Sequence, residues 1–281
     1  NNIKDTNKDF LNFNINPNQK IIIIKLGKNP SSLEIEKSGA KFYEYIYSNS
    51  LLDLSFFESN TREFIKKQKN FIDSFVHGIK LKSYQFNKYK SKKKEKDISI
   101  EILSKNKNIF LDKNKRFEAL LKGLELTKDL VSEPGNILHP DEYVKRIVRL
   151  KKIGLKISVY DKSKLKKLGM NALLGVGQGS IRGSYLVTIE WNGINKKNRP
   201  LAFVGKGVCF DTGGISLKPA KFMEDMTYDM AGSAVVVGLM KNLAMRKAKI
   251  NAVGVVGLVE NMPDGNAQRP GDIVKSYSGK Q

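Results

Sequence analysis

Apolar side chains recur along the chain with two different spacings, and the spacing changes from segment to segment. Intervals of three and four residues between apolar positions predict helices over residues 33–48, 61–75 and 116–131. Runs rich in β-branched and other apolar residues predict strands over residues 20–26, 98–103, 155–160, 171–177, 184–191, 201–205 and 250–259. The first of these strands is expected to be buried. A further helix of small apolar residues is expected around 226–245, and residues 1–18 are expected to be poorly ordered or an edge segment.

The order of these elements predicts an α/β fold in two parts. Strands alternate with helices through the second half of the chain, which is typical of a sheet covered by helices on both faces. Ser132-Glu133-Pro134-Gly135-Asn136 is a clear break, and His139-Pro140 marks the start of a new helix. The predicted organisation is an N-terminal domain over 1–110, a linker helix over 111–132 and a second α/β domain over 133–281.

The balance of charge is strongly basic, with a formal net charge of +22. One interpretation is a nucleic-acid or anionic-membrane partner. Lys rather than Arg carries most of this charge, however, and Arg is the side chain that suits phosphate and base recognition. Compositional bias is therefore the favoured interpretation, and nucleic-acid binding stays as an alternative. The charge run over 88–96 is interpreted as a solvated loop or hairpin tip.

Cysteine use and hydropathy indicate a protein of a reducing compartment. Cys209 is the one cysteine, so no disulfide can form within the chain. No apolar run approaches the roughly 20 residues that span a bilayer. The polar start at Asn1 is typical of neither a signal nor a transit peptide, and its lack of Met indicates trimming. We expect a cytoplasmic location and no membrane partner.

The residues that carry chemistry are concentrated between 204 and 233. Lys206 lies between two glycines after a strand expected to end at Gly205, and Asp211 precedes the turn Thr212-Gly213-Gly214. Lys218 follows, and Asp229 is expected to begin the apolar helix. Charged groups in such apolar surroundings need a partner or a metal. Carboxylates are hard ligands for Mg²⁺, Mn²⁺ or Zn²⁺, and a neutral Lys amine can join them.

At these residues the chain resembles the leucyl aminopeptidases, peptidase family M17. The resemblance is carried by the segments Val204-Gly205-Lys206-Gly207, Phe210-Asp211-Thr212-Gly213-Gly214, Ile215-Ser216-Leu217-Lys218-Pro219, Tyr228-Asp229-Met230, residues 133–140 and residues 173–180. It is strong over about 115–281. Residues 1–110 match only in length, domain order and composition.

The resemblance implies a function and a set of roles. The family releases N-terminal residues, often Leu, from peptides with two divalent metal ions, Mn²⁺ or Zn²⁺ with Mg²⁺ as an alternative. It implies that Lys206 and Asp229 bind one metal, that Asp211 bridges both, and that Lys218 polarises the scissile carbonyl. Met226 would line the pocket for the first side chain of the substrate. A macro-like N-terminal domain and a homohexamer are also implied.

One departure from the family pattern stands out. The family's downstream Asn-Thr-Asp-Ala-Glu-Gly-Arg segment, which supplies further metal ligands and an arginine, does not occur here. The chain is expected to be a fragment, inactive or nearly so alone, with an unpaired sheet edge that opposes assembly. Asp264 and Asp272 have the character of loop residues and are poor substitutes for the absent ligands.

Simpler interpretations accompany each candidate residue. Taken singly, Lys206 is a solvated lysine, Asp211 a turn residue and Asp229 an acid at a helix start. Glu224 and Asp225 are expected to be exposed, and Cys209 to be a small core residue. Residues 175–179 give only a weak nucleotide-loop signal. A phosphate-binding α/β protein that uses the glycines of 204–214 is a third hypothesis. That hypothesis predicts stabilisation by nucleotides, whereas the peptidase hypothesis predicts stabilisation by Mn²⁺ or Zn²⁺.

Overall fold

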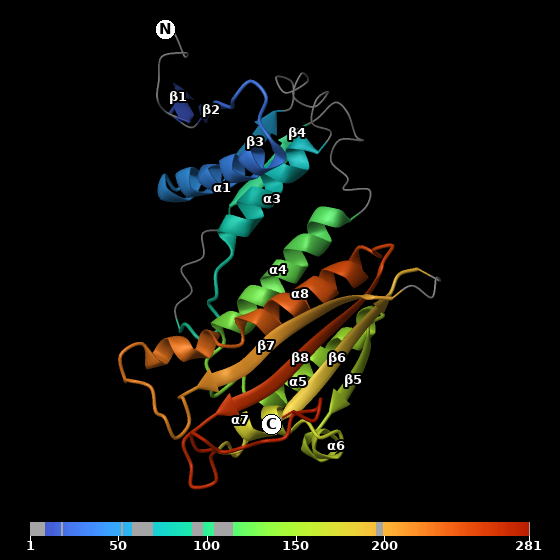
Figure 1. Ribbon diagram of the computed structural model, residues 1–281. Helices are drawn as coiled ribbons and strands as arrows, with labels where there is room; N and C mark the ends of the chain where they lie inside the picture. The colour runs from blue at the N-terminus through green and yellow to red at the C-terminus, as the bar shows by residue number, and fades with distance from the viewer. Residues whose placement is uncertain are drawn as a thin grey trace. The chain divides into compact units, whose positions relative to one another are not determined.

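The computed structural model of the protein describes residues 9–17, 19–51, 53–57, 70–91, 98–103, 115–194 and 199–280. Figure 1 shows the order of the helices and strands along the chain. The chain divides into two compact units, residues 1–113 and 114–281. The buried apolar residues form two separate clusters, one drawn from each unit. Each unit therefore has a hydrophobic core of its own.

The first unit is built from short strands and two described helices. Its elements are β1 (Phe10–Asn16), β2 (Gln19–Ile24), α1 (Ser32–Ser48), β3 (Asp53–Phe57), α3 (Phe71–Ser83) and β4 (Ser99–Leu103). β1 pairs with β2 antiparallel, and β3 pairs with β4 in parallel. Helix α1 begins with a capping box in which Ser31 and Glu34 bond each other's backbone amides. The core lies between α1 and α3, where Phe42 and Phe75 pack ring against ring.

Several predictions for this unit change in detail. The strand over 20–26 is real but not buried, because Ile21 and Ile23 are exposed while Ile22 and Ile24 pack on the core. Residues 10–16 are an ordered strand, in keeping with the edge-segment alternative. The helix predicted over 61–75 is described only from Phe71, and it runs on to Ser83. Residues 61–69, 92–96 and 111–114 lie outside the described residues. The likeness of residues 1–110 to a macro domain stays a prediction.

The second unit is a four-stranded mixed sheet with helices. Its elements are α4 (Arg116–Ser132), α5 (Pro140–Val148), η3 (Arg149–Ile153), β5 (Lys156–Tyr160), α6 (Lys162–Lys167), α7 (Asn171–Val176), β6 (Tyr185–Asn192), β7 (Leu201–Asp211), η4 (Met223–Tyr228), α8 (Ala231–Met245) and β8 (Asn251–Asn261). The strand order is β5-β6-β8-β7, in which β7 and β8 are parallel and the other pairs antiparallel. These features confirm the predicted α/β class.

Helices contact both faces of this sheet. On one face a Cβ at Gly254 of β8 would meet Val236 of α8, and on the other a Cβ at Gly257 would meet Leu173 of α7. Figure 1 shows α4 and α8 side by side, and α8 connects the parallel strands β7 and β8. The parallel pair therefore ends at one edge of the sheet, where Asp211 faces Asn261.

Three predictions for the second unit are wrong in type or extent. Residues 171–176 form helix α7, not a strand, because a short apolar run fits either structure and only packing decides. Strand β7 continues past Gly205 to Asp211, so Lys206 lies within it. The single helix predicted around 226–245 is two helices, the 3₁₀ helix η4 and the α-helix α8, with Asp229 and Met230 between them. None of the described helices combines the length and apolarity needed to cross a bilayer.

Candidate active site

Lys206 lies on β7, where the strand packs directly on the start of α8. A Cβ at Gly205 would come within 2.6 Å of the Cα of Ser233 in that helix, so only glycine allows this approach. The ammonium of Lys206 forms an ion pair with Asp229, 2.7 Å from Nζ to Oδ1. The strand and the junction between η4 and α8 thus bring together two of the candidate metal ligands.

Asp229 is the less solvated member of this pair. Its side chain is 21% exposed, against 60% for Lys206. Its second oxygen, Oδ2, is buried and has no hydrogen-bond partner among the described residues. A buried carboxylate oxygen without a donor costs about 1–3 kcal/mol or more, and a cation would remove that cost. This oxygen is therefore suited to a metal ion.

Asp211 ends β7 and is held by the turn that follows it. Gly213 and Gly214 both have left-handed backbone, with φ of +92° and +70°. This turn brings the Gly213 amide to 2.9 Å from Asp211 Oδ1, and it brings Lys218 Nζ to 2.9 Å from Asp211 Oδ2. The Lys218 amide closes the loop by donating to the Thr212 carbonyl. The glycines thus set the orientation of the carboxylate.

The surroundings of Asp211 keep it ionised. Burial alone would raise the pKa of this carboxyl, since it disfavours the charged form. Hydrogen bonds from Lys218, the Gly213 amide and the Asn261 side chain outweigh burial and hold the pKa of Asp211 below its ordinary value. The group is therefore a carboxylate at neutral pH, as a metal ligand must be.

Met226 connects the two ion pairs through η4. The Lys218 ammonium lies 2.9 Å from the Met226 sulfur. The Asp229 amide donates to the Met226 carbonyl at the end of the same short helix. The five candidate residues thus come from β7, the turn after it, η4 and the junction between η4 and α8. Lys218 is 36% exposed on its side chain, so its ammonium has access to solvent.

The donor set fits a divalent cation. Two carboxylates and one amine are available, the buried Asp229 Oδ2 included, and they are divided between two ion pairs, Lys206 with Asp229 and Lys218 with Asp211. Such oxygen and nitrogen ligands suit Zn²⁺ or Mn²⁺. No group of three or more His, Cys, Asp or Glu is clustered in the part of the chain that the structure describes. The candidate centre therefore depends on Lys206 as much as on the carboxylates.

Asn261, which ends β8 opposite Asp211, is a site residue that no sequence motif predicted. Its side-chain amide donates to Asp211 Oδ1 over 2.7 Å. Its carbonyl accepts from both the amide and the hydroxyl of Thr212. The signal was the pairing of two parallel strands that end level with each other, which no local motif reveals.

The remaining candidates behave as ordinary structural residues. Cys209 is buried, burial raises the pKa of its thiol, and it lies within the core, as predicted. Glu224 and Asp225 are exposed, as expected. Asp264 accepts from the Asn266 amide in a turn. Asp272 is half-buried and pairs with Arg269 at 3.0 Å. These residues offer no further ligand set.

The break after α4 holds one member of a buried ion pair and packs against β7. Glu133 is buried, and its carboxylate accepts from Arg146 at 2.6 Å. Two residues on, Gly135 lies so close to Phe210 that a Cβ would be 3.1 Å from the ring. The break thus packs against the residue next to Asp211. His139 caps α5, as predicted for a helix-start residue.

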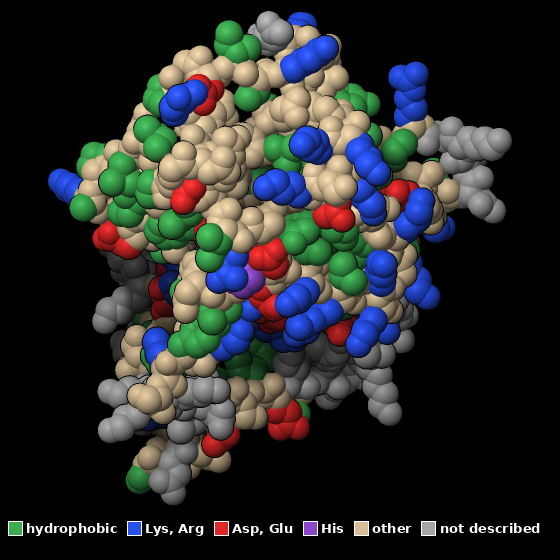
Figure 2. All heavy atoms as spheres, turned by 90° about the horizontal axis from the view of Figure 1, so that it is seen from below, with side chains coloured by type: hydrophobic (Ala, Val, Ile, Leu, Met, Phe, Trp, Pro, Cys, Tyr) green, Lys and Arg blue, Asp and Glu red, His purple; other side chains and the backbone are tan. Residues whose placement is uncertain are grey.

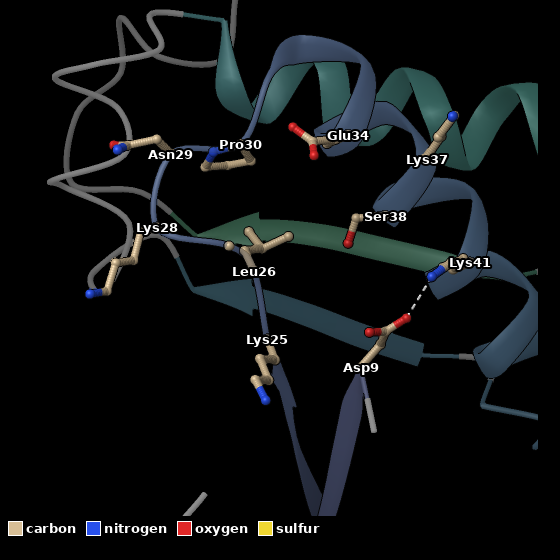
Figure 3. A pocket seen from close by; sticks show the side chains of 11 residues that line it. Asp9, Lys25, Leu26, Lys28, Asn29, Pro30, Glu34, Lys37, Ser38 and Lys41 are labelled. Carbon is tan, nitrogen blue, oxygen red and sulfur yellow. Dashed lines mark hydrogen bonds and ion pairs between the residues drawn. The ribbon is translucent and has the colours of Figure 1, made fainter. Parts of the chain in front are cut away.

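A cavity of about 420 Å³ lies in the first unit, between the start of α1 and the end of β2. Lysines line it, but Figure 3 shows the Lys28 and Lys37 ammonium groups pointing away from each other. Lys41 forms an ion pair with Asp9, 2.7 Å from Nζ to Oδ2. The positive groups therefore do not converge on one point. This cavity lacks the arrangement of groups that β7 and η4 provide.

The surface charge is spread out. Figure 2 shows Lys and Arg side chains distributed over much of one face, with apolar side chains and carboxylates between them. Such a distribution accords with the favoured interpretation of compositional bias. Nucleic-acid binding stays a prediction.

Residues 125–281 match the family described as "Cytosol aminopeptidase family, catalytic domain". The chain is 53% identical over 218 residues to a "Probable cytosol aminopeptidase" of Phytoplasma australiense, covering 77% of this chain and 44% of that protein. It is 45% identical over 274 residues to the protein of the same name from Nitrobacter winogradskyi, covering 93% of this chain and 53% of that protein. The chain thus spans about half the length of the curated relatives it matches.

Among solved structures, the chain is similar to the bottromycin maturation enzyme BotP in complex with Mn. The TM-score is 0.78 at 24% sequence identity, and the match covers 96% of this chain and 57% of that one. This likeness concerns the fold.

Proposed function

The chain belongs to the cytosol aminopeptidase family, and on that premise we propose that the protein is a metal-dependent leucyl-type aminopeptidase that releases N-terminal amino acids from peptides. The observation that carries the proposal is two ion pairs that each have one member on β7. Lys206 pairs with Asp229, and Asp211 pairs with Lys218. Asp229 Oδ2, which is buried and has no hydrogen-bond partner within the described part of the chain, supports it. The Mn named for the fold neighbour makes Mn²⁺ the first ion to test.

In this proposal three side chains hold the cations. Lys206 would bind through its neutral amine and Asp229 through its buried carboxylate oxygen, and Asp211 would serve as a ligand of both ions. Two divalent cations, Mn²⁺ or Zn²⁺, supply Lewis acidity and an activated water when bound. Lys206 must lose a proton to bind, and its ion pair with Asp229 must rearrange.

Lys218 and Met226 act on the substrate in the same proposal. The Lys218 ammonium polarises the scissile carbonyl and stabilises the negative charge that develops on its oxygen. Met226 is half-buried beside Lys218 and offers an apolar wall to the first side chain of the peptide.

The test uses the product of the complete reading frame that contains this chain, supplied with Mn²⁺. We expect it to hydrolyse a leucyl anilide. Lys218→Ala should lower kcat by about 10²–10³-fold, which is typical of losing one donor to a developing oxyanion. Mn²⁺ binding, measured by calorimetry, should persist in this variant, since Lys218 is not a proposed ligand.

The matched control is Lys221→Ala, which removes an exposed lysine of the same loop. It should leave kcat within about twofold of wild type. Absence of leucyl anilide hydrolysis with both Mn²⁺ and Zn²⁺ would contradict the proposed activity. Unchanged kcat in Lys218→Ala would contradict the role assigned to that residue.

Other partners remain separate proposals with their own tests. Phosphate-driven binding to DNA should weaken steeply as salt is raised, and its absence at low salt would remove that proposal. Stabilisation by a nucleotide in place of Mn²⁺ would favour the phosphate-binding hypothesis. The homohexamer and the cytoplasmic location stay predictions, and the mass of the purified assembly tests the first.

A further inference from the structure

Asn261 is the last residue of β8, and it lies directly opposite Asp211, the last residue of β7. The two strands are parallel, so both residues lie at the same end of the sheet, where the two strands finish. β8 is the inner strand of the pair, with β6 on its other side. Asn261 is therefore anchored by the interior of the sheet, whereas Asp211 belongs to the edge strand.

Three hydrogen bonds join Asn261 to the turn that carries Asp211. Its carbonyl accepts from the Thr212 amide and the Thr212 hydroxyl, each over 2.9 Å. Its side-chain amide donates to Asp211 Oδ1 over 2.7 Å. Gly214 completes the enclosure, because a Cβ there would come within 2.8 Å of Asn261 Oδ1. The turn is thus fixed at both its backbone and its carboxylate.

These contacts divide the two oxygens of Asp211 between different partners. Oδ1 receives two neutral N–H donors, from Asn261 and from the Gly213 amide. Oδ2 faces the Lys218 ammonium. Rotation of the carboxylate would break both neutral bonds at once, so the carboxylate is held in one orientation. An N–H donor cannot itself bind a cation, so the Asn261 amide acts on a metal only through Asp211.

We infer that Asn261 is a positioning residue that holds the Asp211 carboxylate in the orientation needed for metal binding. This inference rests on the proposed function, because it takes Asp211 to be a ligand. Groups that orient a ligand in this way typically change metal affinity about 10–100-fold when removed. Asn261 makes no metal contact in this assignment, and its whole effect passes through Asp211 and the 211–218 turn.

The test compares Asn261→Ala and Asn261→Asp in the product of the complete reading frame. The Asp variant keeps the size of the side chain but removes its donor and places a second carboxylate beside Asp211. If positioning by donation is the role, both variants should bind Mn²⁺ about 10–100-fold more weakly than wild type. Asn266→Ala, in the exposed turn that follows, is the control and should bind Mn²⁺ as wild type does.

A second readout uses metal-free protein. Amide hydrogen exchange at Gly213 and Lys218 should speed up by about tenfold in both Asn261 variants and stay unchanged in the control. Wild-type affinity in the Asp variant would overturn the inference, since size alone would then suffice. Tighter Mn²⁺ binding by that variant would also overturn it.

The two proposals fail in different ways. If wild-type protein binds no Mn²⁺ or Zn²⁺, the proposed function fails and Asn261 has no metal role. If wild-type protein binds Mn²⁺ and exchange in the turn is unchanged by both variants, the positioning role fails and the proposed function stands.

Discussion

Gly213 and Asp211 show how single residues control the candidate site. With a left-handed φ of +92°, Gly213 presents its amide to Asp211 Oδ1. A Cβ there would overlap the Ser216 carbonyl oxygen and come within 3.1 Å of the Lys218 nitrogen. Side chains other than hydrogen are thus excluded by both backbone strain and space.

Gly213→Ala should therefore destabilise the protein and loosen Asp211. We expect the free energy of unfolding to fall by about 2 kcal/mol, from strain at positive φ and the overlap with Ser216. Urea unfolding measures this change. Gly265→Ala is the control, because a Cβ at Gly265 meets no atom within 4 Å. Equal stability of the two variants would show that the turn adapts without cost.

Asp141 is a second residue whose ionised form organises its neighbours. Oδ1 accepts from the Tyr185 hydroxyl over 2.6 Å and from the Gly183 amide over 3.2 Å, and Oδ2 lies 3.1 Å from His139 Nδ1. Burial opposes ionisation, but these hydrogen bonds outweigh it and hold the pKa of Asp141 below its ordinary value. The same contact and burial raise the pKa of Tyr185 to about 12.

Asp141→Asn should therefore cost stability in a way that depends on pH. With its folded pKa below the unfolded value of 3.8, the carboxylate stabilises the fold above that pH, and the contribution is lost as the pH falls. We expect a loss of about 2 kcal/mol near pH 7 and a smaller loss near pH 3. Urea unfolding at both pH values measures it, with the exposed Asp225→Asn as control. A loss that does not change with pH would contradict this account.

At the scale of elements, each unit contains a pair of helices in which a glycine of one helix lies against the backbone of the other, and the reverse. In the first unit Gly39 of α1 lies against the Phe75 carbonyl, and Gly78 of α3 lies against the Glu36 carbonyl. In the second unit a Cβ at Gly123 of α4 would be 2.6 Å from the Gly238 carbonyl of α8. Close backbone approach therefore joins both helix pairs, and a single methyl group would separate them.

Gly238→Ala tests this packing in the second unit. The new methyl would overlap the Thr127 hydroxyl and approach the Gly123 carbonyl, so we expect a loss of about 2–3 kcal/mol in unfolding free energy. Val235→Ala, at a side chain of the same helix that is 57% exposed, is the control and should change stability by less than about 1 kcal/mol. A near-neutral Gly238→Ala would mean that α4 shifts freely on α8.

How far the sequence predicts these elements depends on the range of the interaction that fixes them. The helix over 33–48 and the strands over 155–160 and 184–191 follow from local periodicity, and the structure confirms them. The length of β7 depends on pairing with β8 some 50 residues later, so periodicity ended it too early. Asn261 was not predicted as a site residue for the same reason, since only the strand register places it beside Asp211. Lys206, Asp211 and Asp229 could be proposed from the sequence because they lie within one stretch of about 24 residues.

At the scale of the whole molecule, the chain holds two cores that share no residue. One cluster includes Ile35 and Phe75, and the other includes Leu130 and Val256. The division at 113/114 assigns α4 to the second unit. Within that unit, Leu130 of α4 is buried in the core, and α4 packs along α8. The helix predicted as a linker over 111–132 thus contributes to one of the two cores.

This arrangement predicts which pieces of the chain fold alone. A polypeptide of residues 115–281 retains the whole second core and should unfold cooperatively in urea. A polypeptide of residues 133–281 lacks α4. The face of α8 that carries Gly238 is then exposed, and the core loses the Leu130 side chain. Cooperative unfolding should therefore disappear. Trp191, the single tryptophan, reports both through its fluorescence, since its indole donates to the Ala248 carbonyl within that core. Equal midpoints for the two polypeptides would show that α4 only links the units, and that the second domain begins at 133.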